Sequence, residues 1–147
     1  MQIRKGQISD IPRVFELVKE LAIFERAEHE VINSIAQMEI DGFGKKPLFG
    51  FVIAEFEGEI VGMSLYYYRY STWKGKRLYL EDLIVTEKMR GKGLGEKLIE
   101  ATIQIAKETQ CTGVMWQVLD WNESALNFYK KFGVSFDSEW VNVHLNF

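Results

Sequence analysis

A glycine-rich turn is one of two segments whose residue types could do chemistry. It reads Arg90-Gly91-Lys92-Gly93-Leu94-Gly95 and separates a strand-like stretch from a helical one. Glycines let a backbone approach a ligand closely, and the first N–H groups of a helix form an anion site. The G-x-G-x-G spacing fits neither the P-loop nor the Rossmann motif. We interpret the turn as a pyrophosphate site of another kind, favoured by Lys88, Lys92 and Lys97, with a ligand-free turn as the alternative.

Two adjacent carboxylates interrupt the apolar strand that precedes this turn. Glu81 and Asp82 lie in the stretch 78–85, where an acid is poorly favoured unless it has a partner. The two-residue period of a strand places Glu81 on one face with Tyr79 and Asp82 on the other. The pattern therefore predicts that the two carboxylates do not act as a side-by-side pair. Salt-bridged structural acids are the alternative for both.

The elements that must position these groups follow from periodicity, caps and turn signals. The pattern predicts helices over residues 11–26, 35–42, 94–109 and 122–133, and strands over residues 3–5, 49–56, 60–71, 78–85, 114–119 and one or two within 134–147. Three successive strands followed by alternating strands and helices predict a mixed sheet, antiparallel in its first half and parallel at one crossover. No linker or repeat interrupts the chain, so we expect one α/β domain over residues 1–147.

Composition excludes several classes of protein. The chain has 147 residues, 18 Lys and Arg against 21 Asp and Glu, and 47% hydrophobic residues, which suits a globular domain. The net charge of −3 argues against a nucleic-acid partner, and no apolar run is long enough to span a membrane. A single cysteine, Cys111, predicts a reducing cytoplasm. It lies far in sequence from His29 and His144, so neither a nucleophile nor a metal site is expected.

Several motifs together resemble the GNAT superfamily of acetyltransferases. Arg90-x-x-Gly93-x-Gly95 is similar to its acetyl-CoA pyrophosphate motif, and the stretch from Trp121-Asn122 to Phe132-Gly133 is similar to its second cofactor segment. Shorter motifs resemble the diamine branch, which acts on spermidine, spermine and thialysine: Lys19-Glu20-Leu21-Ala22, Asp41-Gly42-Phe43-Gly44, Tyr79-Leu80-Glu81-Asp82 and Asn127-Phe128-Tyr129. The chain departs from the branch at Ser124, where a proline is usual.

The resemblance implies a fold, a reaction and a set of site residues. The fold is a mostly antiparallel mixed sheet with a central parallel splay and about four helices, and acetyl-CoA is the co-substrate with no metal. Glu81 is implied as the base, acting through a water, and Tyr129 as the acid, although spacing alone also allows a core tyrosine. The implied cofactor-binding residues are Leu83, Ile84, Val85, Arg90, Gly91, Lys92, Gly93, Leu94, Gly95, Asn122, Ala125, Tyr129 and Lys131. The implied acceptor-binding residues are Glu25, Glu28, Trp73, Asp82 and Trp140.

Charge distribution bears on the acceptor. Residues 24–44 carry five acids and one base, whereas residues 69–77 carry four bases and no acid. An acidic acceptor side and a basic cofactor side favour a small cationic amine such as a polyamine. An amino acid such as thialysine or a protein N-terminus is the alternative acceptor, with Arg69 or Arg77 as a partner for its carboxylate. A non-catalytic acyl-CoA-binding module is an alternative of another class. The branch also implies a homodimer.

Overall fold

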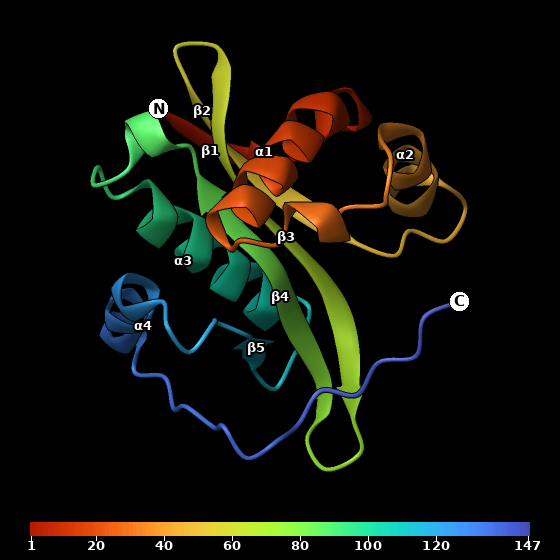
Figure 1. Ribbon diagram of the computed structural model, residues 1–147, viewed down its shortest axis with the longest axis vertical. Helices are drawn as coiled ribbons and strands as arrows, with labels where there is room; N and C mark the ends of the chain where they lie inside the picture. The colour runs from red at the N-terminus through yellow and green to blue at the C-terminus, as the bar shows by residue number, and fades with distance from the viewer. The chain divides into compact units, whose positions relative to one another are not determined.

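The computed structural model describes every residue from Met1 to Phe147. Four 3-10 turns, η1 (Ile8–Asp10), η2 (Glu28–Glu30), η3 (Glu87–Met89) and η4 (Lys130–Phe132), accompany the helices and strands drawn in Figure 1. The helices and strands are, in chain order, β1 (Gln2–Lys5), α1 (Ile11–Phe24), α2 (Ile35–Phe43), β2 (Gly50–Phe56), β3 (Glu59–Ser71), β4 (Gly75–Val85), α3 (Leu94–Glu108), β5 (Val114–Trp116) and α4 (Glu123–Tyr129).

The chain divides into two compact units. The first, Met1–Gln117, contains all five strands with α1, α2 and α3. The second, Val118–Phe147, contains α4 and η4. The expectation of one domain over residues 1–147 stays a prediction. No helix in either unit is both long and apolar enough to cross a membrane.

The sheet of the first unit is mixed, as the sequence predicts. Its strand order is β1-β2-β3-β4-β5, with antiparallel pairs from β1 to β4 and a parallel pair between β4 and β5. The parallel pairing ends at Leu80 and Trp116, because β5 is only three residues long. The last residues of β4, from Glu81 to Val85, therefore extend beyond the parallel ladder, where the resemblance implies a splay.

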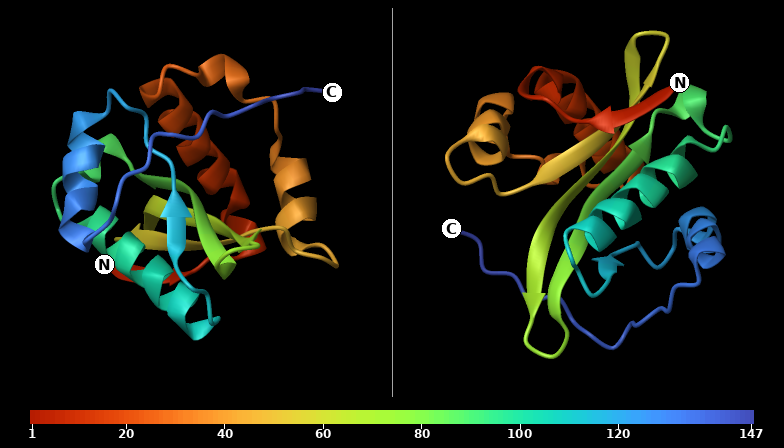
Figure 2. Two further views of the ribbon diagram at one scale, coloured as in Figure 1. Left: turned by 90° about the horizontal axis from the view of Figure 1, so that it is seen from below. Right: turned by 180° about the vertical axis from the view of Figure 1, so that it is seen from behind.

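Helices cover both faces of this sheet (Figure 2). On one face, the apolar stripe of α1 packs with Met38 of α2 against Ile53 and Met63, which are fully buried. On the other face, Leu94 and Leu98 of α3 pack against the sheet. The alternation of side chains along β2, β3 and β4 thus creates one α1/α2 face and one α3 face.

Residues 134–147 correct one expectation, because they contain no helix or strand. The segment has an alternating apolar pattern, but its apolar side chains Val141, Val143, Leu145 and Phe147 are all exposed. A strand needs a neighbour for its backbone hydrogen bonds, and none of the five paired strands extends into this segment. The prediction of strands here was wrong because alternation does not identify a pairing partner.

Candidate active site

A β-bulge brings the two adjacent carboxylates to one face of the sheet. Asp82 of β4 lies opposite Leu65 of β3, whereas Leu80 lies opposite the next residue, Tyr66, so Glu81 has no partner in the ladder. An extra residue of this kind resets the alternation of side chains. Asp82 therefore shares the α1/α2 face with Leu65, and Glu81 interacts electrostatically with groups on that face. The expectation that the two-residue period puts Glu81 and Asp82 on opposite faces was wrong, because the bulge interrupts this period.

Glu25 completes a cluster of three carboxylates, defined here as the acidic cluster of Glu25, Glu81 and Asp82. Glu25 is the C-cap residue of α1. Burial raises the pKa of Asp82 to about 7, and repulsion from Glu81 and then Glu25 adds to this shift. Burial likewise raises the pKa of Glu25, with repulsion from Glu81 as the second cause. Repulsion from Glu81 thus disfavours the ionisation of the other two carboxylates, and a cation at this place would relieve it.

Glu81 is the member of the acidic cluster that solvent reaches most easily. Glu81 is exposed, whereas Asp82 and Glu25 are half-buried. The surrounding protein nevertheless desolvates the carboxylate enough to raise its pKa above the ordinary value. An exposed carboxylate with a raised pKa is a stronger base than an ordinary one, which suits a group that accepts a proton.

Two tyrosines and an arginine flank the acidic cluster on the same face. The rings of Tyr67 and Tyr79 lie 5.1 Å apart, and Glu81 helps to raise the pKa of both phenols after burial. The Arg69 guanidinium lies 5.8 Å from the centre of the Tyr79 ring and donates to the Met115 sulfur at 3.3 Å. The face therefore offers an aromatic wall and one cation beside the carboxylates.

The other implied acceptor residues are Glu28, Trp73 and Trp140, and the structure describes the surroundings of each. Glu28 is exposed on η2, and Trp73 is 85% exposed in the β3–β4 turn, where the Ser71 hydroxyl accepts from its backbone N–H. Trp140 belongs to the second unit and its indole N–H donates to Asp137 at 2.8 Å. Glu28 is not among the charged groups that raise the pKa of the acidic cluster. Their roles in acceptor binding stay predictions.

The glycine-rich turn has the backbone shape that an anion site needs. Gly91 and Gly93 adopt left-handed φ angles of 76° and 79°. Gly93 is the N-cap of α3 and supplies no side-chain cap, so the first N–H groups of the helix face outward from the turn. A Cβ added at either glycine would meet no atom within 4 Å. With Lys92 exposed beside it, the turn fits a pyrophosphate.

Replacing Gly93 by Ala tests this fit against a matched control. Gly58, in the β2–β3 turn, has the same φ of 79° and the same open surroundings. We expect both substitutions to destabilise the protein by about 1 kcal/mol, because an alanine is strained at a left-handed φ. Only Gly93→Ala should weaken CoA binding in a calorimetric titration. An equal loss of affinity in both variants would contradict the assignment.

The side chains at the end of β4 pack on the two faces of the sheet. The side chain of Ile84 belongs to the core against α1, and the side chains of Leu83 and Val85 pack on the α3 side. These side chains are occupied in packing, so only backbone groups of Leu83, Ile84 and Val85 remain for polar contact with a cofactor. Leu94 is also a core residue, whereas Gly95 lies in the first turn of α3.

The second unit carries the remaining implied residues on α4 and η4. The Asn122 side chain caps α4 by accepting from the Ala125 N–H at 3.2 Å. Tyr129 is the last residue of α4, with its ring 5.5 Å from that of Phe128. The Lys131 ammonium lies 5.3 Å from the centre of the Phe128 ring. The role of Tyr129 as the acid stays a prediction.

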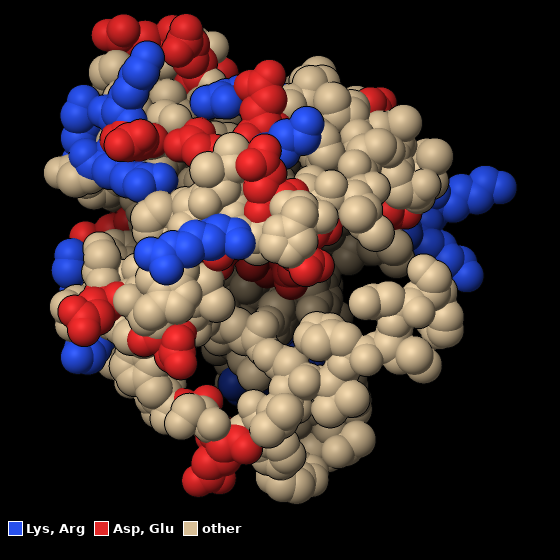
Figure 3. Space-filling model, in the orientation of Figure 1, with Lys and Arg blue, Asp and Glu red and all other residues tan.

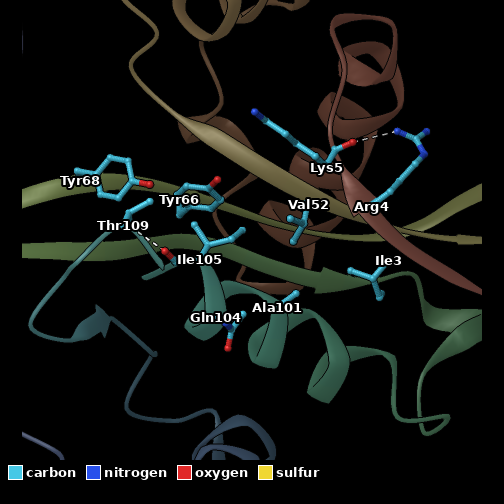
Figure 4. Close-up of a pocket in the computed structure, with 10 residues that line it drawn as sticks. All are labelled: Ile3, Arg4, Lys5, Val52, Tyr66, Tyr68, Ala101, Gln104, Ile105 and Thr109. Atoms are coloured by element: carbon cyan, nitrogen blue, oxygen red, sulfur yellow. Dashed lines mark hydrogen bonds between the residues drawn. The ribbon is translucent and has the colours of Figure 1, made fainter. Parts of the chain in front are cut away.

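A depression on the α3 face is a separate feature. It measures about 460 Å³ and lies between β1, β3 and α3, where Tyr66, Tyr68 and Ile105 point into it (Figure 4). None of the implied site residues lines it. The protein also has no group of three or more His, Cys, Asp or Glu residues placed to hold a metal ion.

The surface charge divides only in part into two regions. On the face of Figure 3, basic side chains gather at the left edge, where the β4–α3 connection lies in Figure 1. Lys88, Arg90 and Lys92 belong to that connection. Acidic and basic side chains intermingle over α1 (Figure 3). On this face, therefore, acidic side chains form no continuous patch over α1 (Figure 3).

Sequence reasoning missed the bulge and the identity of the aromatic wall. The row Tyr66-Tyr67-Tyr68 suggests one face toward the core and one toward a substrate, but only the register shows that Tyr67 faces the carboxylates. The signal for the bulge was present as two adjacent acids in an otherwise apolar strand, which breaks strict alternation.

Comparisons with known proteins agree with this geometry. Residues 11–134 match the acetyltransferase (GNAT) family. The chain is 39% identical over 140 residues to mouse thialysine N-epsilon-acetyltransferase, which covers 90% of this chain and 82% of that protein. It is 32% identical over 88 residues to the spermine/spermidine N(1)-acetyltransferase of Bacillus subtilis strain 168, or 57% of this chain and 58% of that one.

A solved structure shows the same fold. An aminoglycoside acetyltransferase from an uncultured soil metagenomic sample superposes with a TM-score of 0.80 at 22% identity, covering 99% of this chain and 95% of that chain. The sheet with its parallel β4–β5 pair, the glycine turn at the start of α3 and a family match over most of the length lead to one conclusion. The chain belongs to the acetyltransferase (GNAT) family.

Proposed function

We propose that this acetyltransferase moves the acetyl group of acetyl-CoA to a primary amine of a small cationic acceptor of the polyamine or diamine kind. The acidic cluster carries the proposal. Burial and then repulsion from Glu81 raise the pKa of both Glu25 and Asp82, so an acceptor that brings positive charge relieves a repulsion already present in the protein. The two relatives named above, which act on thialysine and on spermine and spermidine, support an amine of this kind.

Glu81 and Asp82 have different tasks in this proposal. An alkylammonium with a pKa near 10.4 costs about 5 kcal/mol to deprotonate at pH 7, so a base must take its proton as the amine attacks. Glu81 is the exposed carboxylate with a raised pKa, and it accepts this proton through a water. Asp82 and Glu25 hold the remaining positive charge of the acceptor, while the rings of Tyr67 and Tyr79 contact its alkyl chain.

The glycine turn and the second unit serve acetyl-CoA, which supplies the acetyl group as a thioester. Gly91, Gly93 and the first N–H groups of α3 bind the pyrophosphate, with Lys92 adding positive charge. Backbone groups at the end of β4, among them the Val85 N–H, orient the acetyl end and polarise its carbonyl. Tyr129 donates a proton to the departing thiolate. Cytoplasmic location and a homodimer complete the proposal, from the single cysteine and the diamine branch.

An amino acid such as thialysine is a second candidate acceptor, favoured by Arg69. This arginine lies on the acidic-cluster face beside Tyr79, where it would pair with an α-carboxylate. Arg77 lies opposite Arg69 in the sheet, but its guanidinium packs against the backbone of Gly113. A simple diamine has no carboxylate and does not need Arg69.

An acceptor panel with a thiol-release assay tests the proposal. Spermidine, a short diamine, thialysine, lysine and a peptide with a free N-terminus are compared with acetyl-CoA as donor. We expect Arg69→Gln to lower kcat/KM for thialysine about 10-fold and to leave the diamine unchanged, because only the former has a carboxylate to pair. Lys74→Gln, in the exposed β3–β4 turn, removes the same charge as a control. CoA binding without transfer to any acceptor would refute the proposed activity.

A further inference from the structure

Helix α1 is tied to the β4–α3 connection by a carboxylate outside the acidic cluster. The Glu20 carboxylate accepts from the Thr86 hydroxyl at 3.1 and 3.2 Å and from the Glu87 backbone N–H at 3.1 Å. It also lies 4.0 Å from the Arg90 guanidinium. Glu20 thus accepts from the first N–H of η3 and joins α1 to the segment that leads into the glycine turn.

Arg90 uses its side chain within the protein. Its Nε donates to the Val85 carbonyl at 3.0 Å, and its guanidinium lies 5.3 Å from the centre of the Phe24 ring. One terminal nitrogen faces Glu20. The side chain therefore contacts the end of β4 and two positions of α1 that lie one helical turn apart. Resemblance alone places Arg90 among the cofactor-binding residues, but these contacts direct its donors toward protein groups.

We propose that Glu20 and Arg90 form a positioning clamp, which holds the glycine turn and the end of β4 against α1, and that Arg90 is not a pyrophosphate ligand. The proposal rests on the proposed function, because it concerns the same cofactor site. Glu25, in the acidic cluster, follows Phe24 directly. The end of α1 thus carries both a carboxylate of the acceptor site and the contacts that hold the cofactor turn. The clamp sets the spacing between the two reactants.

Two acetyl donors distinguish a positioning clamp from a pyrophosphate ligand. Acetyl-pantetheine has the reactive thioester but lacks the pyrophosphate of acetyl-CoA. The clamp also holds the end of β4, whose backbone orients the acetyl group of both donors. We therefore expect Arg90→Gln and Glu20→Gln each to lower kcat/KM about 10-fold with either donor. The double variant should lose no more than either single variant, since both break one unit. Lys92→Gln, on the same turn, should lose activity selectively with acetyl-CoA.

Arg90→Lys sharpens the comparison. Lysine keeps the positive charge but has neither the Nε–H bonded to Val85 nor a planar group to stack on Phe24. The clamp predicts that Arg90→Lys behaves like Arg90→Gln. A pyrophosphate ligand acting through its charge would tolerate lysine and would matter only with acetyl-CoA. That pattern would overturn the proposal.

Hydrogen exchange gives a readout that needs no activity. We expect the amides of residues 86–93 to exchange about 10-fold faster in Glu20→Gln and in Arg90→Gln than in the parent protein, because their anchor to α1 is lost. Lys92→Gln should leave exchange unchanged there. Unchanged exchange in all variants would refute the clamp even if transfer is confirmed. Faster exchange in a protein that acetylates nothing would keep the clamp and refute the proposed function.

Discussion

Replacing Asp82 by Asn is expected to lower kcat/KM for a polyamine about 10- to 100-fold, mainly through a higher acceptor KM. The reason is the loss of a charge-assisted contact to the acceptor ammonium group in a partly desolvated site. Glu81 stays in place as the base, so kcat should change less than KM. Steady-state kinetics with spermidine at saturating acetyl-CoA measures both quantities. The affinity for CoA should not change.

The same variant is expected to be more stable than the parent protein at high pH. The pKa of native Asp82 is about 7, whereas an unfolded aspartate titrates near 3.9, so the native state holds the extra proton between these values. The parent therefore loses stability as pH rises from about 4 to about 7 and does not regain it above. Asparagine does not titrate, so Asp82→Asn should gain up to about 4 kcal/mol at pH 8 relative to pH 4, from about three pKa units at 1.36 kcal/mol each. Its Tm relative to the parent should therefore rise by several degrees between these pH values.

Glu59→Gln is the control for both measurements. Glu59 begins β3 in an exposed turn, so its substitution removes one negative charge far from the acidic cluster. It should change neither the acceptor KM nor the pH dependence of Tm. An Asp82→Asn protein with a normal acceptor KM would show that Asp82 does not face the acceptor. A Tm difference independent of pH would show that its carboxyl titrates normally in the native state.

Replacing Tyr129 by Phe is expected to lower kcat about 100-fold while leaving CoA affinity within about twofold, because a general acid acts only as the thiolate departs. The substitution removes only the hydroxyl and keeps the aromatic ring, so the packing of this ring against Phe128 should survive. Steady-state kinetics gives kcat, and calorimetry gives CoA affinity.

Tyr70→Phe is the matched control for Tyr129→Phe. Tyr70 is 76% exposed on β3 and belongs to no proposed site, so its hydroxyl should contribute to neither quantity. The alternative for Tyr129 is a purely structural core tyrosine. That role predicts a lower Tm in Tyr129→Phe with an unchanged kcat, and this outcome would remove Tyr129 from the mechanism.

Local patterns in the sequence were sufficient for most of the fold. The three- and four-residue spacing of apolar residues predicts α1 and α3, and the left-handed glycines before α3 appear where the turn motif predicts them. These features depend on neighbours within a few residues. The prediction of strands in residues 134–147 was wrong because a strand depends on a distant partner, which its own sequence does not specify.

The candidate site shows the same division. The sequence by itself determined which groups carry chemistry: two adjacent carboxylates in an apolar strand, a glycine turn before a helix, and Tyr129. Only the tertiary structure decided that Glu81 and Asp82 act on one face, because the bulge arises from the pairing of β4 with β3. The tertiary structure also decided that Glu25 lies near Asp82 and that Arg90 contacts Glu20. Both contacts arise because α1 packs against β4 and the β4–α3 connection, which lie far from it in the sequence. Strand register and helix packing are long-range interactions, and residue types alone do not encode where they bring side chains together.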